Sequence, residues 1–213
     1  MKSLFLHAAV TLFVFMQCFF AYGQNVRITY SETIPADAVT CLSLKLDNKL
    51  YLKIGLQSDF PSGKEFHISC YQCIGQEVSK RDYPFRTTCT TENPDSLVIE
   101  VMMQQVQDSV SLAFALDGMV EDLMLPTRYR IPSPDGLDRH YILMETKLDT
   151  PLTLSDEIPL FAVTSGICKE IDWNGQKATL QDYCGLRDKH IHPKEWKETE
   201  GVGNYYFYTI SFQ

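Results

Sequence analysis

Apolar and polar residues alternate with a period of two along much of this chain, most clearly in residues 40–71. Apolar side chains occupy every second position in three runs, residues 42–46, 50–56 and 66–70. A period of two predicts β-strands with one buried and one wetter face. Pairing Leu46 with Leu50 keeps all the leucines on one face, so the pattern predicts a hairpin with a three-residue loop at residues 47–49.

Further strands are predicted wherever the same alternation returns. They lie at residues 25–30, 96–106, 110–116, 119–125, 139–148, 152–164 and 168–180. Asp117-Gly118 and Asn174-Gly175 are residue pairs that tight hairpin turns favour. Residues 204–212 are apolar on both faces, which predicts a strand that is inserted centrally in a sheet or covered on both sides.

The remaining segments connect these strands. Residues 72–93 show no periodicity and predict a long loop tied down by cysteines, and a short helical turn is expected after Pro193. Residues 126–138, rich in proline and glycine, suit either a connection between two sheets or a sub-domain boundary. About ten short strands favour an all-β fold, a β-sandwich or jelly roll with disulfide-tied loops and little helix. We expect a single such domain over residues 24–213.

The first 23 residues have the composition of a secretory signal peptide. A short basic start precedes an almost wholly apolar run over residues 4–22, and Ala21 and Gly23 are the small residues of a cleavage site before Gln24. An uncleaved anchor is the alternative, since about 18 apolar residues can span a bilayer. Cleavage is the preferred interpretation. It predicts a secreted protein, periplasmic in a bacterium, whose mature chain does not insert into a membrane.

The net charge of the mature chain restricts the kinds of molecule that it is expected to bind. Of the 19 lysines and arginines only Lys2 lies in the first 23 residues, so residues 24–213 carry 18 basic against 27 acidic side chains and a net charge of −9. A surface with this excess of acid repels phosphate backbones and anionic lipid. We therefore expect neither a nucleic acid nor a membrane surface as the partner.

Six cysteines remain once Cys18 is removed with the signal peptide, namely Cys41, Cys70, Cys73, Cys89, Cys168 and Cys184. An even number in an exported protein predicts disulfides, and six cysteines allow 15 connectivities. The preferred pairs are Cys168 with Cys184, Cys73 with Cys89, and Cys41 with Cys70. A redox-active dithiol at Cys70 and Cys73, or a zinc site that adds Cys89, is disfavoured because the C-x-x-C motif follows a strand and no second one is present.

Motifs that would name a reaction are missing from the sequence. It contains no Gly-x-Ser-x-Gly, no His-Glu-x-x-His and no acidic calcium-binding loop. His190 and His192, with Asp188 or Glu195, have a spacing that suits zinc or copper, but two histidines in a polar segment are more often solvated. We therefore predict no cofactor, no metal site and no catalytic activity. The alternative is an extracellular hydrolase whose catalytic carboxylates are dispersed along the chain.

Four aromatic residues are poorly explained as core, namely Tyr83 and Phe85 in a loop, Trp173 at a hairpin tip and Trp196 in a polar segment. Aromatic side chains on the loops of a rigid sandwich commonly recognise proteins or sugars, whereas the alternative is that each covers a hydrophobic edge. The preferred function is a secreted, non-catalytic protein that binds an extracellular protein or a glycan. A structural or assembly protein of an extracellular matrix or cell envelope is the third interpretation, and the oligomeric state is left open.

The order of residues 50–54, 66–70 and 114–128 resembles the strand order of galectin-like sandwiches. The sugar-binding His-x-Asn-x-Arg and Trp-Gly-x-Glu segments of that family are absent. The resemblance therefore implies a sandwich and assigns no functional residue.

Overall fold

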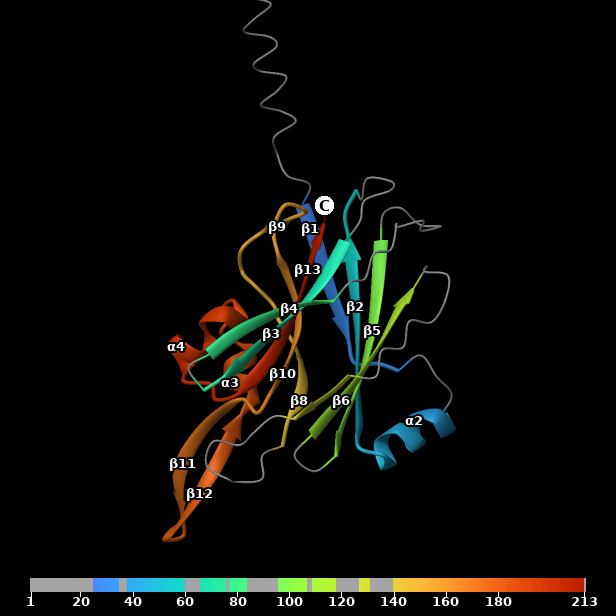
Figure 1. The fold of residues 1–213 in the computed structure, drawn as a ribbon. Coiled ribbons are helices and arrows are strands. Elements are labelled where there is room, and N and C mark those ends of the chain that lie inside the picture. The colour runs from blue at the N-terminus through green and yellow to red at the C-terminus, as the bar shows by residue number, and fades with distance from the viewer. Residues whose placement is uncertain are drawn as a thin grey trace, which may run out of the picture.

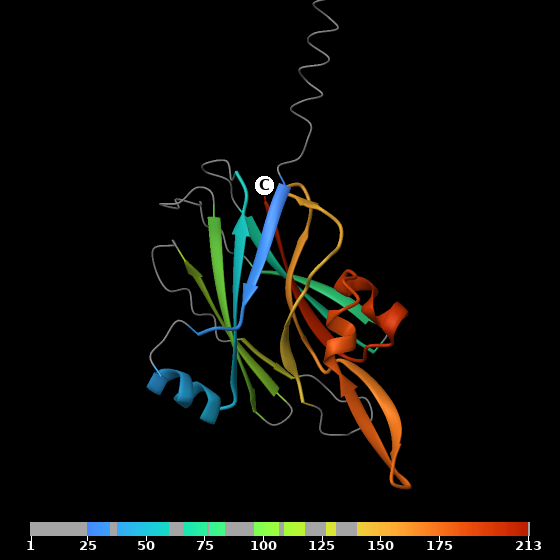
Figure 2. The ribbon, with the colours of Figure 1, turned by 180° about the vertical axis from the view of Figure 1, so that it is seen from behind.

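The computed structural model describes residues 25–34, 38–59, 66–75, 77–83, 96–106, 109–117, 127–130 and 140–212. Within these residues the fold is mainly β, with two large antiparallel sheets and one small projecting hairpin (Figures 1 and 2). The predicted mainly β fold with little helix is therefore confirmed. None of the helices in these ranges has the length and apolar character that crossing a bilayer requires.

The first large sheet has six strands, and its central strands follow the alternation of the sequence. In β2 (Lys49–Gln57), Leu52, Ile54 and Leu56 are buried while the residues between them are partly exposed. In spatial order the strands are β7 (Thr127–Arg130), β6 (Ser109–Asp117), β5 (Ser96–Val106), β2, β1 (Asn25–Ser31) and β9 (Leu152–Thr153).

The second large sheet has five strands and is built around the C-terminal strand. In spatial order these are β4 (Glu77–Tyr83), β3 (Phe66–Ile74), β13 (Tyr205–Phe212), β10 (Ile158–Thr164) and β8 (Ile142–Glu145). Six of the eight residues of β13 are buried. The prediction of a central strand that is apolar on both faces is therefore confirmed.

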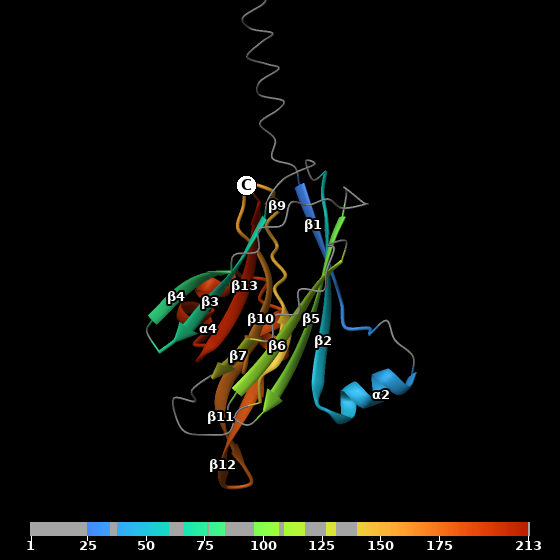
Figure 3. The same ribbon diagram turned by 45° about the vertical axis from the view of Figure 1, so that its right-hand side comes forward.

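The main hydrophobic core lies between the two sheets, which Figure 3 shows as separate layers. Ile54 and Ile99 come from the first sheet, whereas Ile68 and Tyr208 come from the second, and all four belong to one buried cluster. At its centre the rings of Phe161 and Tyr208 stack at a centroid distance of 4.5 Å. Aromatic stacking of this kind adds to the stabilisation from burial alone.

A smaller core covers the outer face of the second sheet. Three short helices pack there, α3 (Tyr183–Arg187), η1 (Pro193–Glu195) and α4 (Trp196–Glu200). Trp196 and Leu186 from these helices are buried against Tyr205 and Phe207 of β13. The Tyr205 hydroxyl donates to the Pro193 carbonyl at 2.7 Å, which holds η1 on the sheet. The predicted helical turn after Pro193 is thereby confirmed.

The hairpin predicted at residues 42–54 is wrong. Residues Ala38–Leu46 form the helix α2, which stands beside the end of β2 (Figure 3). Both edges of β2 are already hydrogen-bonded, one to β1 and the other to β5. Residues 42–46 therefore had no free edge of β2 with which to pair. Val39, Leu42 and Leu46 have the i, i+3, i+7 spacing of a helix, whereas Leu42, Leu44 and Leu46 have the period of a strand, so this segment contains both patterns.

The long loop predicted at residues 72–93 is wrong in its first part. Strand β3 continues to Ile74, the chain turns at Gly75, and β4 returns alongside as far as Tyr83. Gly75 has a positive φ of 58°, a conformation that glycine adopts without steric cost. The remainder of that segment, including Phe85 and Cys89, lies outside the described residues.

The disulfide-tied loops are not borne out. None of the five described cysteines forms a disulfide: Cys41, Cys70, Cys73, Cys168 and Cys184. Cys41 lies on α2, beside the end of β2, whereas Cys70 is buried between the two sheets. Cys184 is exposed at the start of α3, whereas the Cys168 thiol lies 4.0 Å from the Ser165 hydroxyl. Cys73 faces the outer core.

The region proposed as a sub-domain boundary contains one described strand. Within residues 126–138, β7 pairs with β6 from Ser109↔Arg130 to Leu112↔Thr127 and so belongs to the first sheet. The signal peptide and the predicted strand at residues 119–125 lie outside the described residues.

Candidate functional site

The projecting hairpin, β11 (Ile167–Trp173) and β12 (Gln176–Asp182), has the turn that its sequence predicts. Asn174 and Gly175 have φ angles of 55° and 81°, and Trp173 pairs with Gln176 across the turn. Two successive positive φ angles are what a type I′ turn requires. The Asp172 carboxylate accepts a hydrogen bond of 2.7 Å from the Gly175 backbone N–H, which reinforces the turn.

The pairing register gives the hairpin one apolar and one polar face. Ile171 lies opposite Ala178, and Trp173 lies beyond them at the tip of the same face. Lys169 and Leu180 pair on this face nearer to the base. The alternate residues of both strands, including Glu170 and Lys177, lie on the other face. There the side chains of Glu170 and Lys177 form an exposed ion pair at 3.7 Å.

The apolar face is open to solvent. Trp173 is 67% exposed and Leu180 is 48% exposed, while Ile171 is half-buried. Within the described residues the hairpin forms a sheet of its own, with neither strand paired to the two large sheets. A two-stranded ribbon alone is only marginally stable in water, and exposed large apolar side chains grouped on one face commonly mark an interaction site.

The base of the hairpin is fixed to the main body. Gln181 donates from its side-chain amide to the carbonyls of His140 and Ser165, both at 3.1 Å. The Tyr183 hydroxyl donates to the same His140 carbonyl at 2.7 Å. Asp182 ties the hairpin to α3, because its carboxylate accepts from the Gly185 N–H at 2.7 Å and pairs with Lys169 at 3.0 Å. The apolar face is thus presented in a defined orientation.

A second cluster of functional groups surrounds Glu157 on the outer face of the second sheet. Its carboxylate accepts hydrogen bonds from the Tyr71 hydroxyl at 2.8 and 2.9 Å and from the Thr209 hydroxyl at 3.0 Å. The ammonium groups of Lys194 and Lys80 lie 3.0 and 3.1 Å from the same carboxylate. Lys194 also lies over the Tyr71 ring, at 4.6 Å from its centroid.

These neighbours fix the protonation of Glu157. Burial raises the pKa of its carboxyl, but the hydrogen bonds from Lys194, Tyr71, Lys80 and Thr209 outweigh burial and lower the pKa to about 2. Burial, and then the bond to Glu157, raise the pKa of the Tyr71 hydroxyl. An acid held ionised and surrounded by donors is unsuited to proton transfer near neutral pH. The cluster therefore joins β3, β13 and η1 through charge and hydrogen bonds.

The four aromatic residues predicted for recognition have different positions. Trp173 is exposed at the hairpin tip, as its sequence position indicated. Trp196 is 2% exposed and belongs to the outer core, so its predicted surface position is wrong. Its indole N–H donates to the Ile191 carbonyl at 3.2 Å, so its polar group is hydrogen-bonded within the outer core. Tyr83 ends β4, but its side chain and the whole of Phe85 are outside the described residues.

The two histidines considered as metal ligands make separate contacts. The Nδ1 atom of His190 lies 2.7 Å from the Asp149 carboxylate, whereas His192 Nδ1 accepts from the Lys194 N–H at 3.1 Å and caps η1. The His192 ring packs edge-on against Phe207, and its burial, followed by the charge of Lys194, lowers its pKa. Across the described ranges no group of three or more His, Cys, Asp or Glu side chains is arranged to hold a metal ion.

Sequence reasoning did not identify Ile171, Ala178 and Leu180 as partners of Trp173. The signal was present, because the predicted Asn174-Gly175 turn fixes a register that places all four on one face. For Glu157 no local signal exists, since its donors come from residues 71, 80, 194 and 209. The chain matches no protein-family model, and comparisons with curated proteins and with solved structures found no similar protein.

Proposed function

We propose that this chain is an exported, non-catalytic binding protein that recognises another extracellular protein through the apolar face of the β11–β12 hairpin. The observation that carries the proposal is the exposure of Trp173 and Leu180 on one face of a hairpin whose base is hydrogen-bonded to the body. An aromatic anchor with aliphatic neighbours, held at a rigid projection, is a typical centre of a binding hot spot. The sandwich arrangement of two sheets suits this role as a scaffold.

The neighbours of Trp173 favour a protein over a glycan. Ile171, Ala178 and Leu180 bring aliphatic carbon to the shared face. A sugar site needs polar groups beside its aromatic platform to bond the hydroxyls. On this face Lys169 and Asp182 are already paired with each other at 3.0 Å, and Gln176, opposite Trp173, is the other polar side chain. With a pKa of about 2, Glu157 is unsuited to act as the general acid of a hydrolase.

The proposal is tested by comparing capture by two forms of the protein. The wild type and Trp173→Ser are immobilised and exposed to the extracellular proteins of the organism that produces the chain, and retained proteins are quantified by mass spectrometry. A protein retained by the wild type and lost with Trp173→Ser is then purified for titration calorimetry. We expect Trp173→Ser to weaken its binding at least about 30-fold, the equivalent of a hot spot of about 2 kcal/mol.

Val78→Ser is the matched control, because Val78 is 56% exposed on β4, away from the hairpin. It should leave the affinity of the captured protein unchanged. Equal retention by wild type and Trp173→Ser would contradict the proposal. So would binding to an array of purified glycans that is lost with Trp173→Ser, since the ligand would then be a sugar.

A further inference from the structure

The connection between β1 and β2 is longer than the sheet requires. Strand β1 ends at Ser31, which pairs with Lys53, and β2 begins at Lys49, only four positions away along the same strand. The connection instead contains α2, which stands beside the end of the sheet (Figures 1 and 3). A long excursion where a short turn would serve usually has a role in binding.

Helix α2 exposes apolar side chains. Val39 is 75% exposed and Leu46 is 83% exposed, whereas Cys41 and Leu44 are half-buried. The helix has nine residues, and a helix of this length depends on packing for its stability. Its C-terminal end is held at the sheet, because the Gln104 amide donates to the Asp47 carbonyl at 3.2 Å. Val39 and Leu46 are seven positions apart and so lie on the same side of the helix, which is largely exposed to solvent.

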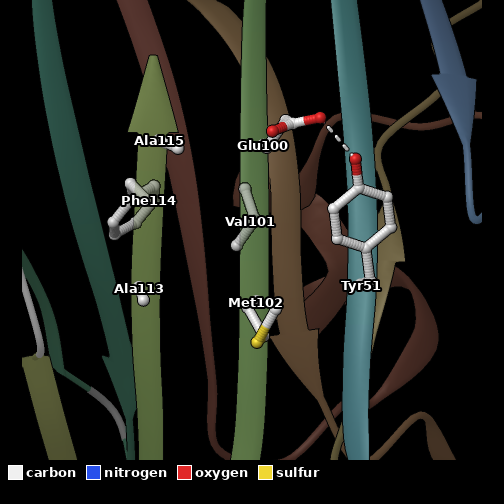
Figure 4. A pocket seen from close by; sticks show the side chains of 7 residues that line it. All are labelled: Tyr51, Glu100, Val101, Met102, Ala113, Phe114 and Ala115. Carbon is white, nitrogen blue, oxygen red and sulfur yellow. Dashed lines mark hydrogen bonds between the residues drawn. The ribbon is translucent and has the colours of Figure 1, made fainter. Parts of the chain in front are cut away.

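The outer face of the first sheet contains a matching hollow (Figure 4). It has a volume of about 150 Å³ and lies over β2, β5 and β6. Met102, Ala113 and the Tyr51 ring form its apolar surface, and the small alanines of β6 leave the depression. The Tyr51 hydroxyl donates to the Glu100 carboxylate at 2.6 Å, so the polar end of this ring is already satisfied. The outward-facing side chains that line it, Tyr51, Glu100, Met102, Ala113 and Ala115, are all partly exposed.

We propose that the hollow binds α2 of a second copy of this chain, in a two-fold symmetric dimer in which each copy inserts its helix into the other. Such a reciprocal contact buries both uncovered apolar features of each chain at once. The helix-in-groove mode uses a short helix with exposed apolar side chains, which α2 is. None of the residues that line the hollow comes from α2 of the same chain, which stands beside the end of β2 (Figure 3).

The charges around the two surfaces are complementary. Lys45, in the last turn of α2 next to Leu46, is the one charged residue of the helix and is exposed. Glu100 is the one charged residue that lines the hollow, and its side chain is 32% exposed. Its nearest ammonium group, on Lys53, is 3.9 Å away, which leaves room for a second cation. Opposite charges at the rim favour the correct pairing of copies.

The test measures self-association of the protein released by a secreting expression host, by sedimentation velocity across a concentration series. Leu46→Glu disables the helix and Ala113→Glu disables the hollow, with Met102→Lys as a second variant of the hollow. Each variant alone should weaken dimerisation at least about 30-fold. An equimolar mixture of Leu46→Glu and Ala113→Glu should regain part of the dimer, because one intact helix and one intact hollow meet in each mixed pair.

Recovery in the mixture distinguishes this arrangement from others. If two helices paired with each other, Ala113→Glu would dimerise unaided, and if two sheet faces paired, Leu46→Glu would do so. Either result, or a wild type that stays monomeric up to about 100 μM, would overturn the proposal. Leu180→Glu, on the hairpin, is the control that should leave dimerisation unchanged, so this proposal and the hairpin proposal can fail independently. Circular dichroism confirms that each variant is folded.

Discussion

The behaviour of Glu157 depends on side chains that the sequence separates widely. Burial by itself would raise the pKa of this carboxyl and favour its neutral form. Four donors from three strands and a helix reverse that effect and hold its pKa at about 2, against an ordinary value of 4.5. A carboxyl whose pKa falls on folding stabilises the folded state above its unfolded pKa. That stabilisation disappears as the pH falls from about 4.5 to about 2.

We predict that Glu157→Gln lowers the free energy of unfolding by about 1–3 kcal/mol at pH 7, an order of magnitude taken from the pKa difference. The substitution removes the charge that pairs with Lys194 and Lys80. Urea denaturation at pH 7, 4.5 and 2.5 measures the effect. The difference between variant and wild type should shrink as the pH falls, because the wild-type carboxylate then becomes protonated.

Glu170→Gln is the control for this prediction. Glu170 and its partner Lys177 are 78% and 88% exposed, and ion pairs between exposed side chains contribute little. Its unfolding free energy should match the wild type within a few tenths of a kcal/mol. A Glu157→Gln protein as stable as the wild type at pH 7 would show that the cluster does not stabilise the fold.

At the scale of elements, Gly166 determines how the hairpin leaves the body. It lies between β10 and β11, has a φ of 73°, and a Cβ there would lie 2.8 Å from Tyr183 and 2.9 Å from the Asp182 carbonyl oxygen. The backbone oxygen cannot move aside as a flexible side chain would. A side chain at this position would therefore force apart the base of the hairpin and α3.

We predict that Gly166→Ala lowers the free energy of unfolding by about 2–4 kcal/mol, from backbone strain together with the steric clash. Gly75→Ala separates the two effects. Gly75 also has a positive φ, 58°, but no atom lies within 4 Å of an added Cβ. Gly75→Ala should therefore lower the free energy of unfolding by only about 1 kcal/mol. Thermal unfolding of both variants measures the difference. Equal midpoints would rule out the clash at Gly166.

A comparison of β11–β12, β2 and α2 shows which properties of an element a local sequence pattern predicts. Residues 167–182 were predictable because the Asn174-Gly175 turn and the alternation on both sides belong to one continuous segment. Strand β2 was predictable as a strand but not in its pairing, since its neighbours β1 and β5 come from distant segments. Helix α2 was missed because Leu42, Leu44 and Leu46 have the period of a strand, while Val39, Leu42 and Leu46 in the same nine-residue segment have that of a helix, and packing decides between them.

At the scale of the whole molecule, the binding proposal assumes that the protein is exported. We predict that the protein recovered outside the producing cell begins at Gln24, because signal peptidase cuts after the small residues Ala21 and Gly23. Intact-mass spectrometry of the released protein measures this directly. A full-length chain retained in the membrane fraction would support the uncleaved anchor.

The sequence by itself determined the mainly β class, most strand positions and the turn at Asn174-Gly175. It also determined that residues 205–212 form a central strand that is apolar on both faces. These properties follow from side chains that alternate locally or carry their own turn preference. Only the tertiary structure decided that residues 38–46 form a helix, that Trp196 is buried, and that four distant donors meet at Glu157. Burial and ion pairing depend on which segments meet in space, and local alternation does not encode that.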